Sequence, residues 1–404
     1  MRATGRRYGF LTAAAVAAVT LWASASSSMN YPLYAEHWRL EPWVTTAMFA
    51  AYPLALIPML LVFGNLSDYV GRRTAILWGL GAILLGGVAL GLAPDVWVVF
   101  LGRVLLGLGV GLSLSPATAA VMEFGGPDGA RRAGATVSAA TAVGLTLAMI
   151  VGGTLIEFAP APLVLNQWAL VLVAGVVFGL ALRLPRHTPD EALGRWRPRG
   201  IAFPRTGRAR FAAGILAVVA GYVIGVIFIG LGAAIARSLL HTDDVFVGGI
   251  VIAVSTAAVG VTSLLIRKAR PVPLLIAGLA ASAVSMLALI LSGAAASLPL
   301  FFASSLTSGL AYAFLVSGGL GLVGAAAPIQ HRAAAVSTAY FFGYAAQASA
   351  AIWLGIVETT SGFGEAVAIG AALVVIPALV SVLLAVLRRA PRTEPAAVAP
   401  VPQR

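Results

Sequence analysis

The sequence predicts an all-α polytopic membrane protein whose twelve transmembrane helices form two pseudo-symmetric six-helix bundles. Two observations predict this class: twelve long apolar runs, and positive charge confined to alternate gaps between them. Each run has at least 19 residues, enough for a helix to cross about 30 Å of hydrocarbon. The runs are Tyr8–Met29, Trp43–Phe63, Thr74–Leu92, Val96–Met122, Ala133–Ile156, Leu163–Leu182, Phe211–Ala236, Val245–Ile266, Val272–Leu291, Leu298–Ala327, Ala333–Val357 and Ala366–Leu387.

The placement of arginine and lysine predicts the orientation. All but Arg39, Arg103 and Arg237 of the 26 Lys and Arg residues lie before the first run, after the last, or in even-numbered gaps. Cytoplasmic loops carry such an excess of positive charge. We therefore expect a multi-pass protein of the cell (plasma) membrane, in contact with the lipid bilayer and with both termini in the cytoplasm.

Composition excludes several other classes. The net charge of +12 suggests nucleic acid, but the arginines are divided among separate loops instead of forming one face, so we expect no nucleic-acid partner. The chain has no cysteine, and its four histidines are dispersed. We therefore expect no metal, no cofactor and no enzymatic activity, and we expect a monomer.

The first run also has the form of a secretory signal peptide, because arginines precede it and Ala23-Ser24-Ala25 follows its apolar part. Cleavage would leave five runs before the long central gap and six after it. We expect the first run to be retained, since retention keeps the two halves equal.

The gap 183–210 contains eight arginines and no apolar run, so it divides the chain. We predict an N-terminal half (1–194), a basic cytoplasmic linker (195–210), a C-terminal half (211–388) and a disordered tail (389–404). Duplication of a six-helix unit is common among transporters. Three features recur in the same order in the two halves. Gly64 and Arg72 match Gly260 and Lys268, and Arg103-x-x-x-Gly107 matches Ser305-x-x-x-Gly309. Arg131-Arg132-Ala133-Gly134-Ala135 followed by Gly144 matches His331-Arg332-Ala333-Ala334-Ala335 followed by Gly343.

The second gap contains a dense polar motif, Gly64-Asn65-Leu66-Ser67-Asp68-Tyr69-Val70-Gly71-Arg72-Arg73. The two glycines permit tight turns, and Asp68 precedes a helix N-terminus, where negative charge is favoured. Asp68 can also pair with an arginine and so hold two helices together.

This motif resembles the signature loop between helices two and three of the major facilitator superfamily. The resemblance covers roughly Tyr8 to Leu387 and implies the MFS fold. In that family the loop is a conformational latch on the cytoplasmic face. The resemblance therefore implies this role for Gly64, Asp68, Gly71, Arg72 and Arg73, although Arg72 and Arg73 also serve simply as topology markers.

Arg103 lies inside the fourth run, where a charged side chain is costly unless it faces a partner or a cavity. Drug exporters of the same superfamily similarly carry an arginine followed by glycines on helix four, and that resemblance implies a role for Arg103 in proton coupling. Snorkelling toward the outer headgroups is the alternative.

The fifth run contains Gly144, Gly152 and Gly153 and only partly resembles the antiporter signature of that family, because the proline before the glycine pair is missing. The glycines indicate either an antiporter or close helix packing.

Polar and aromatic residues near the middle of several runs are candidates to line a substrate cavity. Tyr340, Tyr344 and Gln347 share one helical face, which suits an apolar molecule with a few hydrogen-bonding groups. Interhelical hydrogen bonding is the alternative for each residue. The candidates are Asn30, Tyr31, Tyr222, Tyr312, Tyr340, Tyr344 and Gln347.

These features favour a secondary transporter that exports a small, hydrophobic, neutral or anionic molecule, since none of the 14 acidic residues lies in the middle of a run. Proton coupling would then use Glu36, Asp68 or a path that the sequence does not reveal. Import of a small nutrient is the alternative within transport. A membrane-embedded enzyme would need clustered acid–base residues, and a receptor or scaffold would need larger soluble parts.

Overall fold

The computed structural model describes residues 3–64, 66–125, 129–185, 207–230, 232, 235, 245–266, 269–327 and 332–387. The predicted tail and most of the predicted linker lie outside these residues. The elements are α1 (Ala3–Ala25), η1 (Ser28–Asn30), α2 (Tyr31–Trp38), α3 (Pro42–Val62), α4 (Ser67–Val70), α5 (Arg72–Gly91), α6 (Val96–Phe124), α7 (Gly129–Phe158), α8 (Pro162–Ala181), α9 (Arg208–Gly225), η3 (Val226–Gly230), α11 (Val245–Leu265), α12 (Pro271–Ala294), α13 (Leu298–Ala326), α14 (Arg332–Ser361) and α15 (Phe363–Leu387).

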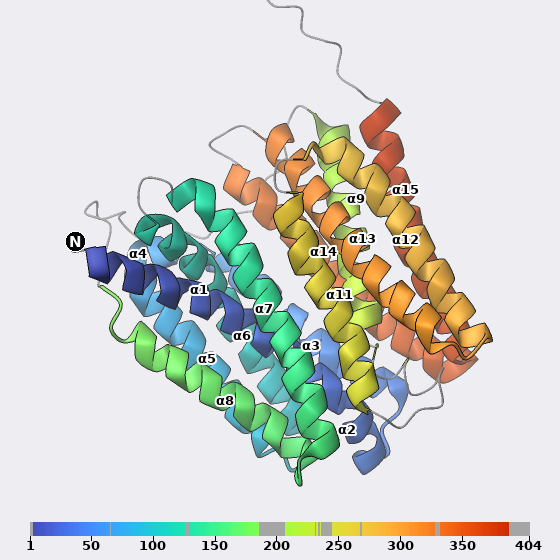
Figure 1. Cartoon of the computed structure of the whole chain (residues 1–404), viewed down its shortest axis with the longest axis horizontal. Coiled ribbons are helices and arrows are strands. Elements are labelled where there is room, and N and C mark those ends of the chain that lie inside the picture. The colour runs from blue at the N-terminus through green and yellow to red at the C-terminus, as the bar shows by residue number, and fades with distance from the viewer. Residues whose placement is uncertain are drawn as a thin grey trace, which may run out of the picture.

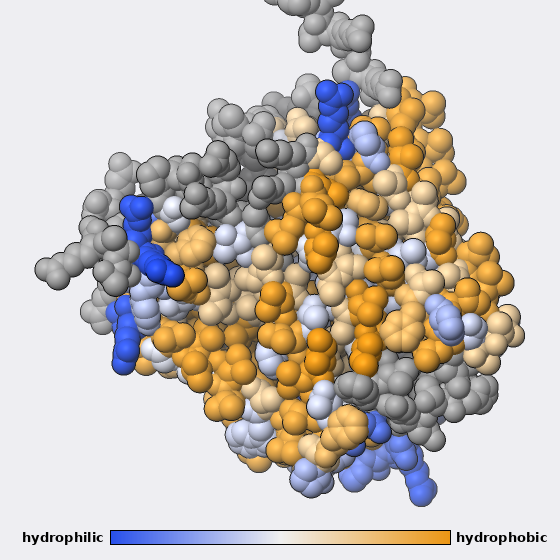
Figure 2. All heavy atoms as spheres, viewed as in Figure 1, coloured by the Kyte–Doolittle hydropathy of each residue, from blue (hydrophilic) through white to orange (hydrophobic). Residues whose placement is uncertain are grey.

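The predicted runs agree with these helices. In the described part of the chain, eleven helices are long and apolar enough to cross a membrane, and a shorter apolar helix, Gly249–Leu265, occupies the place of the eighth run. Large apolar side chains such as Trp97 (75% exposed) and Leu172 (71% exposed) cover the outside. Figure 2 shows apolar residues over the middle of one face and the most hydrophilic residues at its edges.

Helix starts are encoded locally. Asp95 begins α6 by accepting hydrogen bonds from the backbone N–H groups of Trp97 (2.9 Å) and Val98 (3.1 Å). Proline lies in the first turn of α2, α3, α8, α12 and α13, where its missing N–H costs no helical hydrogen bond.

The first spanning segment is not one continuous helix. α1 ends at Ala25, η1 follows, and α2 continues to Trp38, so the segment Gly5–Trp38 is longer than the predicted run. Ser24 and Ser26 donate to carbonyls three residues back, at Leu21 and Ala23, and such local bonds compete with helical ones.

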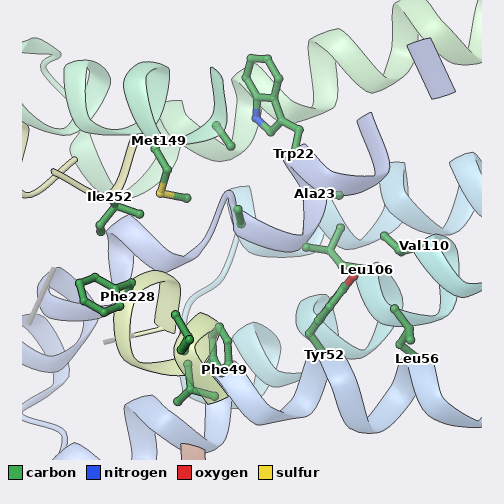
Figure 3. Packing of buried hydrophobic residues seen from close by; sticks show 14 of the residues in the cluster. Trp22, Ala23, Phe49, Tyr52, Leu56, Leu106, Val110, Met149, Phe228 and Ile252 are labelled. Atoms are coloured by element: carbon green, nitrogen blue, oxygen red, sulfur yellow. The ribbon is translucent and has the colours of Figure 1, made fainter. Parts of the chain in front are cut away.

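The helices form two groups. The first six spanning helices pack mainly on one another, as do the last six, and the groups lie side by side in Figure 1, drawn from blue to green and from yellow to red. Two helix pairs, α7 with α11 and α3 with α14, make the principal contacts between the groups. Met149 of α7 faces Ile252 of α11 in the core (Figure 3).

One predicted repeat recurs as the same physical contact in both halves. A Cβ on Gly107 of α6 would lie 2.4 Å from the Tyr52 carbonyl oxygen of α3, and a Cβ on Gly309 of α13 would lie 2.2 Å from that of Ser255 in α11. Four residues earlier in each case, Arg103 and Ser305 donate to carbonyls of the same neighbouring helices. The second predicted match is therefore confirmed.

The other two matches differ in outcome. Gly144 packs α7 on α1 and Gly343 packs α14 on α9, so the third match is also confirmed. The first match is wrong, because Gly64 follows the end of α3 whereas Gly260 lies inside α11, where a Cβ would meet Ala142 at 2.2 Å. Their shared spacing to a basic residue is a coincidence.

These contacts predict that Gly107→Ala and Gly309→Ala each destabilise the protein, because an added methyl group would force two backbones apart. Overpacking of this kind costs about 1–3 kcal/mol. The control is Gly81→Ala, since a Cβ on Gly81 meets nothing within 4 Å. Thermal unfolding in detergent should show a lower midpoint for each test variant than for the wild type. The midpoint of the control should equal that of the wild type. Equal midpoints for all three would contradict the close approach.

Candidate functional site

The motif of the second gap folds into a compact turn between α3 and α5. Gly64 leaves α3 where a Cβ would lie 2.5 Å from the Leu60 carbonyl oxygen, and Gly71 has φ of +86° between α4 and α5. Both positions need glycine, because L side chains clash or are strained there. The sequence therefore fixes the path that brings Asp68 back to Arg72.

Arg72 is the centre of the polar contacts in this turn. Its guanidinium pairs with Asp68, donates to Ser67 Oγ (2.6 Å) and pairs with Glu123 Oε1 (3.1 Å) at the end of α6. The two ion pairs join α4, α5 and α6, all within the first group of helices. Arg73 is half-buried, and no ion pair of this residue is found in the described part of the chain.

Arg103 is fully buried, with 0% of its surface exposed. Its Nε donates to the Met48 carbonyl (3.3 Å), Nη1 to that of Ser24 (3.1 Å) and Nη2 to that of Phe49 (3.4 Å). Snorkelling toward the outer headgroups, the alternative considered from the sequence, is therefore wrong. The arginine faces the protein interior and ties α6 to α1 and α3.

Two of the three carbonyls that Arg103 binds lie at irregular points of the neighbouring helices. Phe49 is four residues before Pro53, which has no N–H to donate to the Phe49 carbonyl in α3. Ser24 lies one residue before the end of α1. Arg103 thus supplies donors where the helices lack their own.

Three aromatic rings surround the guanidinium. Its Cζ lies 5.0 Å from the ring centroid of Tyr52, 5.9 Å from that of Tyr31 and 6.0 Å from that of Phe49. Cation–π attraction at these distances partly compensates the charge. In Figure 3, Tyr52 of α3 reaches toward Leu106 of α6 and Ala23 of α1.

A second cluster brings together four of the predicted cavity residues. The ring of Tyr222 in α9 lies 4.7 Å from that of Tyr344, 6.0 Å from that of Tyr312 and 6.5 Å from that of Tyr340. The Gln347 side chain, on the same face of α14, has a buried Oε1 with no hydrogen-bond partner. We call Tyr222, Tyr312, Tyr340, Tyr344 and Gln347 the tyrosine cluster.

The tyrosine cluster lies beside a break in helical geometry and beside the other group of helices. α9 passes directly into the π-helical turn η3, and a Cβ on Gly225 at that junction would lie 3.6 Å from Gln347 Nε2. π-helical turns occur frequently at functional sites. α14, which carries Tyr340, Tyr344 and Gln347, packs on α3, so the cluster lies next to the first group of helices.

The remaining predicted cavity residues lie elsewhere. Asn30 is fully buried, donates to the carbonyls of Pro162 and Leu163, and accepts from Asn166 (2.7 Å) and Gln167 (3.2 Å). Asn30 therefore forms interhelical hydrogen bonds to α8, which was the alternative to lining a cavity. Tyr31 lies beside Arg103 and not in the tyrosine cluster.

The glycines of the fifth run lie at three different helix contacts. A Cβ on Gly144 would lie 2.0 Å from the Ala18 carbonyl oxygen of α1, and one on Gly152 would lie 3.2 Å from Asn166 Oδ1 of α8. Gly153 faces Gly249 of α11, where a Cβ on Gly249 would lie 3.3 Å from Gly153 Cα. These contacts favour close packing as the role of the glycines.

Two residues of these sites were not singled out from the sequence. Glu123 is the first acidic residue after the fourth apolar run, and Tyr52 is the one tyrosine of the second run. Their positions beside Arg72 and Arg103 depend on helix rotation, although an acidic residue directly after the fourth run was an available signal. In the described residues no group of His, Cys, Asp and Glu could hold a metal ion.

Comparison with known proteins defines the class. The family model of the Major Facilitator Superfamily matches residues 11–272, and the chain belongs to that family. It is a multi-pass membrane protein of that family, with eleven helices in the described residues that are long and apolar enough to cross a membrane.

Among curated proteins the chain is similar to three bacterial relatives. It is 30% identical to the multidrug efflux pump LfrA of Mycolicibacterium smegmatis, over 40% of this chain and 31% of LfrA. It is 28% identical to the uncharacterized MFS-type transporter EfpA of Mycobacterium tuberculosis, over 35% of this chain and 24% of EfpA. The methylenomycin A resistance protein of Streptomyces coelicolor is 30% identical, over 20% of this chain and 17% of that protein. Each match thus spans less than a third of the relative.

Solved structures share the whole fold. A point mutant of the nucleoside transporter NupG has a TM-score of 0.74 at 13% identity, covering 93% of this chain and 99% of that one. A point mutant of a peptide transporter, POT, has a TM-score of 0.74 at 16% identity, covering 95% and 94%. A bacterial homologue of the human lysosomal transporter Spinster, inward-facing and unoccupied, scores 0.71 at 16% identity, covering 94% and 97%.

The contacts of Asn30 predict a structural role. Asn30→Ala would leave the side chains of Asn166 and Gln167 with fewer partners, and a buried polar group without a partner costs about 1–3 kcal/mol. The control is Thr154→Ala, because the Thr154 hydroxyl bonds only within its own helix, to Ile150. The thermal unfolding midpoint should fall for Asn30→Ala and stay within error for Thr154→Ala. An unchanged midpoint with altered substrate affinity would instead restore Asn30 as a cavity residue.

Proposed function

We propose that this transporter exports a small, largely hydrophobic molecule, neutral or anionic, across the cell membrane, driven by the proton gradient. The observation that carries the proposal is the tyrosine cluster, three of whose residues lie on α14, the helix that packs on α3 of the other half. Phenol rings offer apolar faces together with hydroxyl groups, and the Gln347 oxygen offers an unused acceptor. The efflux and resistance functions in the names of two relatives support the direction.

The mechanism we propose is alternating access between halves 1–194 and 211–388. On the orientation expected from charge, Thr46, near the start of α3, and Gly355, near the end of α14, lie on the outer side. A Cβ on Gly355 would lie 1.9 Å from Thr46 Oγ1, so the halves meet closely there. The cytoplasmic ion pairs of Arg72 remain inside one half. These contacts favour a state that is closed to the outside.

Coupling in this proposal involves the latch and Arg103. Protonation of Asp68 or Glu123 from the cytoplasm would remove the negative partners of Arg72 and free α5 from the end of α6. Arg103 would transmit the change through α1 and α3, to which it is bonded.

Energised inside-out vesicles test the proposal. They should accumulate a hydrophobic fluorescent dye, and an uncoupler should abolish the accumulation. Asp68→Asn should slow it about tenfold, the kinetic equivalent of about 1.4 kcal/mol, because Arg72 loses a charged partner. The control is Glu365→Gln, at an exposed outer position.

Two results would contradict the proposal. Normal turnover in Asp68→Asn would remove the latch from the transport cycle. Gradient-driven loss of a substrate from such vesicles, with none accumulating, would indicate import.

A further inference from the structure

Arg103 carries a buried charge without an opposite charge beside it. No carboxylate among the described residues pairs with it, and its partners are three neutral carbonyls at 3.1–3.4 Å. N–H···O bonds are usually near 2.9–3.0 Å, and charged ones are shorter still. A guanidinium has five N–H groups, so two remain after these three long bonds.

Hydroxyl groups without partners lie in the adjoining segment. Four of the eight buried side-chain atoms that lack a hydrogen bond belong to the stretch 27–34, on Ser27, Ser28, Tyr31 and Tyr34. The Tyr34 hydroxyl lies near Gln167 but without a bond of normal geometry. The ring of Tyr31 lies 5.9 Å from Arg103 Cζ, and Tyr34 follows Tyr31 by three residues on α2, so the two side chains lie on one face of that helix. A buried hydroxyl without a partner is costly, so these groups need a ligand.

We propose that Arg103, together with the hydroxyl groups of Tyr31 and Tyr34, binds a small monovalent anionic group. An anion accepts hydrogen bonds from the spare guanidinium N–H groups and from both phenols, and it neutralises the buried charge. The group is either a free halide or the carboxylate of the transported molecule. The carboxylate source rests on the proposed export function, whereas the halide source does not.

The site would also distinguish between substrates by their charge. A planar guanidinium matches a carboxylate with two parallel hydrogen bonds, whereas a cation at this position would be repelled. The absence of acidic residues from the middle of the apolar runs strengthens that preference. A buried water is the competing occupant, because it too satisfies hydroxyls, but it leaves the charge uncompensated.

Anion titration of the full-length chain in neutral-lipid nanodiscs tests the site. Chloride in one series and benzoate in the other replace a bulky sulfonate at constant ionic strength, and tryptophan fluorescence reports the unfolding midpoint. The midpoint of the wild type should rise and saturate with at least one of the two anions. Tyr31→Phe keeps the ring and removes the hydroxyl, so its apparent Kd should be about tenfold higher. Arg103→Gln should abolish the saturable rise.

The matched control is Tyr8→Phe, since the Tyr8 hydroxyl donates to the Leu180 carbonyl (2.7 Å), away from Arg103. Its Kd should equal that of the wild type. Saturation by chloride identifies a free halide, and saturation by benzoate alone identifies the carboxylate. No saturation with either anion, or an equal Kd in Tyr31→Phe, overturns the site and assigns the pocket to water. If Arg103→Gln does not fold, Tyr31→Phe alone decides. Because no gradient is present, this outcome is independent of the vesicle assay.

Discussion

The absence of water from the bilayer interior is the constraint on which this structure depends. Helices in lipid gain little from burying apolar surface against one another, so they associate by close backbone contact and by internal hydrogen bonds. The glycines of α6 and α13 provide that contact inside each half, at Gly107 and Gly309. The same device appears between the halves, where Gly249 lies against Gly153. Close packing of helices within each half and between the halves follows from this one requirement.

The same constraint gives Arg103 its importance. A charge that reached water would need no internal partner, but this one is fully buried and bonded to carbonyls at the end of α1 and near Pro53 of α3. The first half of the transporter therefore contains an arginine where the second half has Ser305, and the serine makes a corresponding bond to Val251. The symmetry of the fold is kept while one half acquires a positive charge. Because of this difference, the proposed anion site lies in the first half. The tyrosine cluster belongs to the second half.

The spans were predictable because a bilayer imposes length and composition on each helix. α13, for example, begins at Leu298 as predicted and ends within one residue of the predicted end. Partners within the site were less predictable, because they depend on helix rotation and on breaks. The shared face of Tyr340 and Tyr344 follows from helical spacing, and both rings contact Tyr222. By contrast, nothing in the sequence indicates that the ring of Tyr52 approaches Arg103 or that Asn30 bonds to α8.

The proposed alternating access requires the two halves to reorient about the contact between α3 and α14. Because the chain has no cysteine, single spin labels can be placed cleanly at Glu41, which precedes α3, and at Glu365, in the first turn of α15. Double electron–electron resonance in nanodiscs measures the distance between these two labels and so tests whether the halves reorient. A label pair at Glu41 and Trp97 is the reference within one half. The account predicts two distance populations for the first pair, whose proportions change with pH and substrate, and one unchanging population for the reference. A single invariant distance for the first pair under all conditions would contradict it.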